Sequence, residues 1–121
     1  MSSYKRSTPR YYAYLDVEIG DSALPLKTTN ISLGGTQLSC ERMQGDMLLK
    51  SPKFRGDTVD IKLSLSAEKV CFIKCEVSYF TPYDEDEYLI GIKFLEFIDN
   101  SLELLVAFIN ENEGKLLRPV K

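Results

Sequence analysis

The stretch Asn30-Ile31-Ser32-Leu33-Gly34-Gly35 lies between two strand-like segments, and the rest of the chain is best understood from it. Two consecutive glycines permit backbone conformations with positive φ and allow a ligand to approach the main chain closely. Asn30 and Ser32 add side-chain donors and acceptors. These residue types are also the ordinary residues of tight turns, so the stretch alone fits a plain turn as well as a binding turn.

The segments on either side of this turn alternate apolar and polar residues, as half-buried strands do. We predict strands at 11–19, 23–29, 36–40, 58–66, 69–80 and 88–97. Pro25 marks the second strand as an edge or irregular strand, and the strands at 58–66 and 69–80 should form a hairpin. The side chains expected to face inward are Tyr11, Ala13, Leu15, Val17, Ile19, Thr36, Leu38, Cys40, Val59, Ile61, Leu63, Leu65, Cys71, Ile73, Cys75, Val77, Tyr79, Tyr88, Ile90, Ile92 and Phe94.

A helix is predicted after the last strand. Asn100 followed by Glu103 fits a capping box, and Gly114 is a natural C-terminal stop. The apolar residues at helical spacing, expected to pack on the core, are Leu102, Leu105, Val106 and Ile109.

Residues 41–57 do not alternate clearly. Their apolar residues Met43, Met47, Leu48 and Leu49 could pack as a helical turn. We favour a long loop folded over one end of the core. The acidic run at 84–87 is interpreted as a solvated turn without metal.

These elements predict an all-β fold with a C-terminal helix, in which a small antiparallel barrel is closed or plugged by that helix. We divide the single domain into a flexible N-terminal arm at 1–10, a β-barrel at 11–98, the helix at 99–114 and a tail at 115–121. The arm is polar, so nothing evident offsets the entropy of ordering it without a ligand.

Charge and composition narrow the function. The net charge is −3, which argues against DNA or RNA as a partner, yet Lys5, Arg6 and Arg10 give residues 1–10 a positive charge without any acid. No apolar run is long enough to span a bilayer and no secretory signal is visible, so we expect a cytoplasmic protein without membrane insertion. The chain has no His, and its three cysteines suggest reduced thiols, so we predict no enzyme and no metal.

Arg6 and Arg10 form the pattern Arg-x-x-x-Arg, and Asn30, Ser32 and Gly35 form Asn-x-Ser-x-x-Gly. In this order the two patterns resemble the PilZ domain family, which binds cyclic di-GMP through an Arg-x-x-x-Arg motif and a later [Asp/Asn]-x-Ser-x-x-Gly motif. The segment Gly91-Ile92-Lys93-Phe94 is also similar to a late strand of that family. The resemblance implies a six-stranded antiparallel PilZ-like β-barrel, with cyclic di-GMP as ligand and no other cofactor.

By this resemblance, Arg6 and Arg10 would contact phosphate oxygens and the Hoogsteen edge of guanine, both of which suit a forked guanidinium. Asn30 and Ser32 would complete a guanine pocket, and Gly35 would let the base lie close to the backbone. The implied function is a cyclic di-GMP receptor whose arm changes conformation on binding. It would signal to an unnamed partner protein in motility, polysaccharide or virulence control.

The alternative is a PilZ-like interaction module that docks on a protein without nucleotide. We expect a monomer or a weak homodimer, and the number of nucleotides bound stays open.

Overall fold

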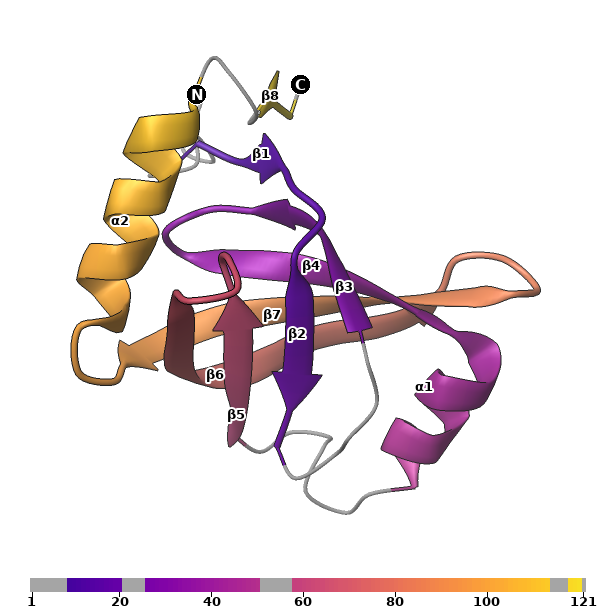
Figure 1. Cartoon of the computed structure of the whole chain (residues 1–121). Coiled ribbons are helices and arrows are strands. Elements are labelled where there is room, and N and C mark those ends of the chain that lie inside the picture. The colour runs from indigo at the N-terminus through magenta and orange to yellow at the C-terminus, as the bar shows by residue number, and fades with distance from the viewer. Residues whose placement is uncertain (1–8, 21–25, 51–57, 114–117, 121) are drawn as a thin grey trace, which may run out of the picture.

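The computed structural model describes residues 9–20, 26–50, 58–113 and 118–120. Strands dominate these residues, which also contain two helices (Figure 1). The elements in order are β1 (Tyr11–Tyr12), β2 (Asp16–Ile19), β3 (Leu26–Ile31), β4 (Gly35–Glu41), α1 (Arg42–Leu49), β5 (Thr58–Ser64), β6 (Val70–Pro82), β7 (Glu87–Phe97), α2 (Ser101–Asn112) and β8 (Arg118–Pro119).

Six strands close into an antiparallel barrel. They follow the order β2-β5-β6-β7-β4-β3, and pairing between β2 and β3 completes the ring. Closure satisfies the strand edges that an open sheet would expose. The prediction of a six-stranded antiparallel barrel with a C-terminal helix is therefore confirmed. Outside the ring, β1 pairs with β3, and β8 pairs with β1.

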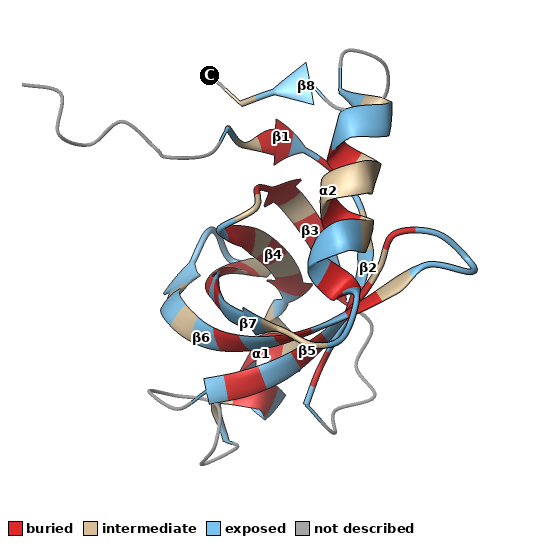
Figure 2. Ribbon diagram, turned by 90° about the vertical axis from the view of Figure 1, so that its left-hand side faces the viewer, coloured by how far each residue is buried: buried red, intermediate tan, exposed pale blue. Residues whose placement is uncertain are grey.

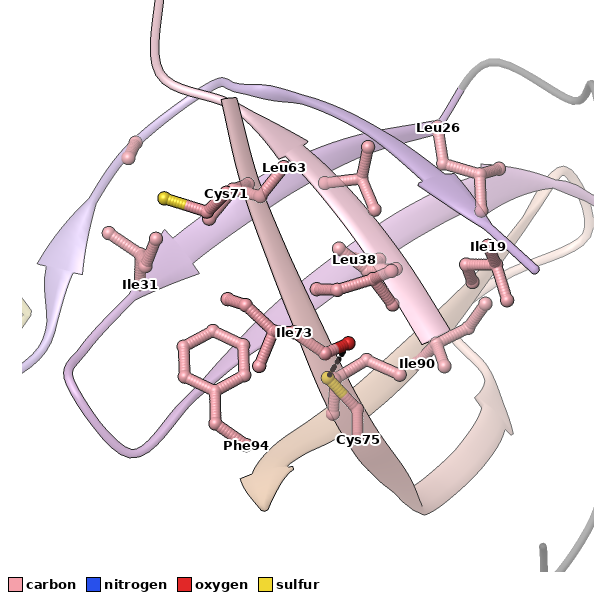
Figure 3. Close-up of a cluster of buried hydrophobic side chains, with 14 of the residues drawn as sticks. Ile19, Leu26, Ile31, Leu38, Leu63, Cys71, Ile73, Cys75, Ile90 and Phe94 are labelled. Carbon is pink, nitrogen blue, oxygen red and sulfur yellow. Dashed lines mark hydrogen bonds between the residues drawn. The ribbon is translucent and has the colours of Figure 1, made fainter. Parts of the chain in front are cut away.

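The core fills the barrel, and the strands alternate between buried and exposed residues (Figure 2). Figure 3 shows its centre, where Ile19, Leu26, Ile31, Leu38, Leu63, Cys71, Ile73, Cys75, Ile90 and Phe94 point toward one another. Most residues that we predicted to face inward are buried. Leu15 and Val77 are half-buried, and Tyr79 is exposed.

The strand predicted at 11–19 is wrong as one continuous element, because it divides into β1 and β2. At the break the side chain of Thr28 adds two hydrogen bonds to the backbone bonds that remain, Ala13 N–H to Thr29 O and Thr28 N–H to Leu15 O. Its Oγ1 donates to the carbonyl oxygen of Ala13 at 2.6 Å and accepts the N–H of Leu15 at 2.9 Å. The alternation survives the break, so Ala13 remains buried.

A bulge in β3 re-aims the residue that follows it. Thr28 pairs with Leu38 on β4, whereas Asn30 pairs with Gln37, so Thr29 is one extra residue on β3. A one-residue shift of register turns every later side chain to the opposite face. Asn30 consequently shares the outer face of the barrel with Gln37 instead of continuing the inward series of Thr28.

A second bulge acts in the same way on β6. Val77 pairs with Ile92 of β7 and Tyr79 pairs with Gly91, which leaves Ser78 as the extra residue. The prediction that Tyr79 faces inward is therefore wrong. Phe80 takes the next inward position and packs against the core in its place.

Helix α1 occupies part of the region where we favoured a loop, so that prediction is wrong for 42–49; residues 51–57 lie outside the described residues. The helix rests on Tyr88 of β7. A Cβ on Gly45 would overlap the Tyr88 ring, and the Tyr88 hydroxyl donates to Asp46 Oδ1 at 2.8 Å. Met43 and Met47 are exposed rather than packed, with 74% and 54% of their surface accessible.

Helix α2 packs against β6, as expected for a helix that covers the barrel. Its buried residues are Ser101, Leu105 and Ile109, whereas Leu102 is exposed, so the predicted stripe is wrong at that position. The predicted capping box is also wrong, since the Asn100 side chain makes no cap hydrogen bond. Gly114, the predicted stop, lies outside the described residues; the helix ends at Asn112.

Candidate functional site

The predicted site residues fall where β1, β3 and β4 meet, except that Arg6 lies outside the described residues. Arg10 directly precedes β1, which pairs with the end of β3. Arg10 Nη1 donates to Asn30 Oδ1 at 3.5 Å. The structure thus brings Arg10 and Asn30 together, and among the described residues Arg10 has no ion pair.

Asn30 is nearly buried, with 9% of its surface exposed, although it lies on the outer face. Its Nδ2 donates to Gln37 Oε1 and to Thr29 Oγ1, both at 3.4 Å. The amide oxygen of Asn30 therefore remains to accept the hydrogen bond from Arg10. Because this carboxamide carries no charge, it holds Arg10 without repelling an incoming anion.

Ser32 shapes the turn between β3 and β4. Its Oγ accepts the Gly34 N–H at 3.1 Å and donates to the Gly35 carbonyl oxygen at 3.3 Å. Its own N–H donates to the same carbonyl at 2.9 Å. These bonds are typical of a Ser-stabilised turn, and the side chain is buried.

Position 35 requires a glycine because strand β7 lies too close to admit a side chain. A Cβ at this position would collide with the carbonyl oxygen of Ile92. Positive φ plays no part, because among the described residues it occurs at Gly20 and Asp99. The close approach that we expected the glycine to offer a ligand is, in the structure, an approach of β4 to β7.

Sequence reasoning missed a polar network on the outer face. Gln37 Oε1 accepts from Thr29 Oγ1 at 2.7 Å, and Gln37 Nε2 donates to the hydroxyl of Tyr79 at 2.5 Å. Gln37 could have been found, since alternation over 36–40 places it outward. Tyr79 could not, because only the bulge at Ser78 turns it to this face. Cross-strand neighbours form one row: Arg118, Tyr12, Asn30, Gln37, Gly91 and Tyr79.

The contacts of β1, which directly follows Arg10, fix the position of Arg10. The Tyr11 hydroxyl donates to Glu113 Oε2 at 2.8 Å, just after α2. This bond to a carboxylate, with some desolvation, raises the pKa of Tyr11. The Val120 N–H donates to the Arg10 carbonyl oxygen at 2.9 Å. Strand β1 is therefore held by β3, β8 and the end of α2.

Other chemistries find little support in the described residues. They contain no group of three or more His, Cys, Asp or Glu placed to hold a metal ion. Burial raises the pKa of Cys40 and Cys71 to about 11 and that of Cys75 to about 12, which makes these thiols poor nucleophiles. Within the same part of the chain, neither helix has the length and apolar character needed to cross a membrane.

The solved structures that resemble this chain include the following two. The inhibitor of motility MotI/DgrA of Bacillus subtilis aligns with a TM-score of 0.68 at 19% identity, over 92% of this chain and 52% of its own. PlzA of Borreliella burgdorferi, in complex with c-di-GMP, aligns with a TM-score of 0.51 at 17% identity, over 85% of this chain and 47% of its own. The chain thus spans about half the length of each, and these identities establish the fold alone.

No curated protein matches the chain. The family model of the PilZ domain, however, matches residues 4–111. This range contains both sequence motifs and the whole barrel. The chain therefore belongs to the PilZ domain family.

Proposed function

We propose that this protein is a receptor for cyclic di-GMP. The observation that carries the proposal is the contact between Arg10 and Asn30, which joins the two family motifs at one place on the outer face of the barrel. The complex of PlzA with c-di-GMP supports this choice of ligand for a barrel of the same fold.

The electrostatics of Arg10 suit an anionic ligand. Its guanidinium makes one long hydrogen bond of 3.5 Å to a neutral amide. A phosphodiester offers the same group two parallel bonds between opposite charges, with typical lengths of about 2.7–2.9 Å. Arg10 can therefore exchange its amide contact for phosphate at little cost, and Arg6, four residues earlier in the sequence, would join it.

Asn30, Ser32 and Gly35 have distinct parts in this proposal. Asn30 presents its amide to the edge of a guanine. Ser32 keeps the turn in shape through its bonds to Gly34 and Gly35, and Gly35 lets β4 approach β7. Two of the three motif residues thus support the pocket through its backbone.

The proposed output is non-enzymatic. Binding would order residues 5–10 over the barrel beside the turn, and a partner protein would recognise the surface so formed. MotI/DgrA is described as an inhibitor of motility, and inhibition of a process by a barrel of this fold supports an effector role. We place this action in the cytoplasm, with motility, polysaccharide or virulence control as its field.

Isothermal titration of the purified protein with cyclic di-GMP tests the proposal, with GMP as the matched control. We expect saturable binding of the cyclic dinucleotide and far weaker binding of GMP, which has one base and cannot engage the two arginines together with the turn. Absence of cyclic di-GMP binding would favour the interaction module without nucleotide. Equal binding of GMP would also contradict the proposal.

A further inference from the structure

The outer face beside Asn30 carries an aromatic ring that rests on bare backbone. A Cβ added to Gly91 would overlap ring atoms of Tyr79, so the ring lies directly over the glycine. Tyr79 as a residue is still 39% exposed. One side of the ring is therefore supported by β7, and the ring retains surface open to solvent.

The orientation of this ring is also fixed at its hydroxyl. Gln37 Nε2 donates to Tyr79 Oη at 2.5 Å. The other end of the Gln37 amide accepts from Thr29 Oγ1 at 2.7 Å and from Asn30 Nδ2 at 3.4 Å. Tyr79 is thereby connected through Gln37 to Asn30, the residue that holds Arg10.

Packing of the core does not explain this arrangement. Regular alternation would have placed Tyr79 inside the barrel, and the bulge at Ser78 turns it outward instead. The residue beneath it is glycine, which contributes no side chain. An aromatic ring held in one orientation loses little conformational entropy when a ligand stacks on it.

We propose that Tyr79 is a stacking platform for a base of the nucleotide ligand, set in place by Gly91 and Gln37. The inference rests on the proposed function and extends its site from the turn across β4 and β7 to β6. Neighbouring strands lie about 4.8 Å apart, so a ring over β7 is roughly 10 Å from Asn30 on β3. A ligand that carries a base and a phosphodiester can reach both the ring and Arg10.

A tryptophan reporter tests the stacking directly. The chain contains no tryptophan, so Tyr79→Trp introduces a single fluorophore at the platform. We expect cyclic di-GMP to quench its emission saturably, with the affinity that titration calorimetry gives for the wild type. Tyr83→Trp is the matched control, since Tyr83 is 66% exposed in the turn of the same hairpin, and its emission should not change.

Affinity measurements separate stacking from structural support. Tyr79→Leu should weaken binding by about ten- to a hundredfold, the usual effect of losing one base–aromatic stack, whereas Tyr79→Phe should stay within about threefold of wild type. Gly91→Ala should weaken binding by displacing the ring, yet add nothing in the Tyr79→Leu background. Thermal unfolding of each variant verifies that it is folded.

The outcomes for the platform and for the receptor function are distinguishable. If the wild type binds cyclic di-GMP but Tyr79→Leu binds equally well, or Tyr79→Trp is not quenched, the platform is refuted and the receptor function stands. Additive effects of Gly91→Ala and Tyr79→Leu would likewise refute it. If the wild type does not bind, both the function and the platform fall.

Discussion

Arg10 and Asn30 are 20 residues apart in the sequence and are joined by a hydrogen bond of 3.5 Å between Nη1 and Oδ1. The acceptor is neutral, and among the described residues no carboxylate pairs with Arg10. The guanidinium is thus positioned by the fold without being neutralised. Such an arrangement suits a group that binds an anion.

Arg10→Ala should weaken cyclic di-GMP binding by roughly ten- to a hundredfold, because a hydrogen bond to a charged group is worth about 1.5–3 kcal/mol. Arg10→Lys should recover little of this, since an ammonium cannot fork onto phosphate. Arg6→Ala should have an effect similar to that of Arg10→Ala. Titration calorimetry measures the affinities, and unchanged melting temperatures serve as the control for folding. Normal affinity in both alanine variants would contradict the site assignment.

Ligand binding should order the N-terminal arm. Amide hydrogen exchange over residues 2–11 should be fast in the free protein and slow with saturating cyclic di-GMP, because the arginines would close on the ligand. Strand β1 begins at Tyr11 and is already paired with β3, so protection should extend from β1 toward the N-terminus on binding. Slow exchange without ligand, unchanged by its addition, would mean that no such switch exists.

Gly35→Ala should destabilise the fold. The added Cβ would collide with the Ile92 carbonyl oxygen, and overpacking of this kind costs about 1–3 kcal/mol. Gly20 is the control, because it has φ of 56° with no atom within 4 Å of an added Cβ. There Asn should be tolerated better than Ala, since Asn adopts the left-handed region, whereas at Gly35 neither should be tolerated. Urea unfolding measures these differences.

The same variant separates two explanations for the glycine of the motif. If Gly35→Ala keeps wild-type stability and loses only ligand affinity, the glycine makes room for a base, as the sequence first suggested. If stability falls, the glycine makes room for β7.

The buried thiols should make the folded protein less stable as the pH rises. Burial raises the pKa of all three from 9.0, to about 11 for Cys40 and Cys71 and about 12 for Cys75. A raised folded-state pKa leaves stability intact below pH 9 and removes it as pH rises through the window from about 9 to 12, because the unfolded chain then releases protons more readily. Urea unfolding at successive pH values should show this decline.

Thiol labelling provides an independent check. At pH 8 a disulfide reagent such as Ellman's should react slowly with the folded protein and rapidly in denaturant, since the thiolate is the reactive form and the thiols are buried. Fast labelling of the folded protein would contradict their burial.

The sequence by itself determined the class of fold and the location of two motifs. Alternation is a local signal, so the hairpin of β5 and β6 and the barrel with its C-terminal helix could be predicted from it. Arg10 and Asn30 could be named by resemblance to a family, and pairing of β1 with β3 brings them together.

Only the tertiary structure decided which side chains face the site. The bulges at Thr29 and Ser78 depend on how β3 and β6 pair with their neighbours, and no local pattern reveals a pairing between distant segments. For the same reason, the sequence could not reveal that an added Cβ at Gly35 would clash with β7, or that α1 contacts Tyr88. Periodicity reports which residues can lie on one face, whereas an extra residue in one strand, set by its partner, decides which face that is.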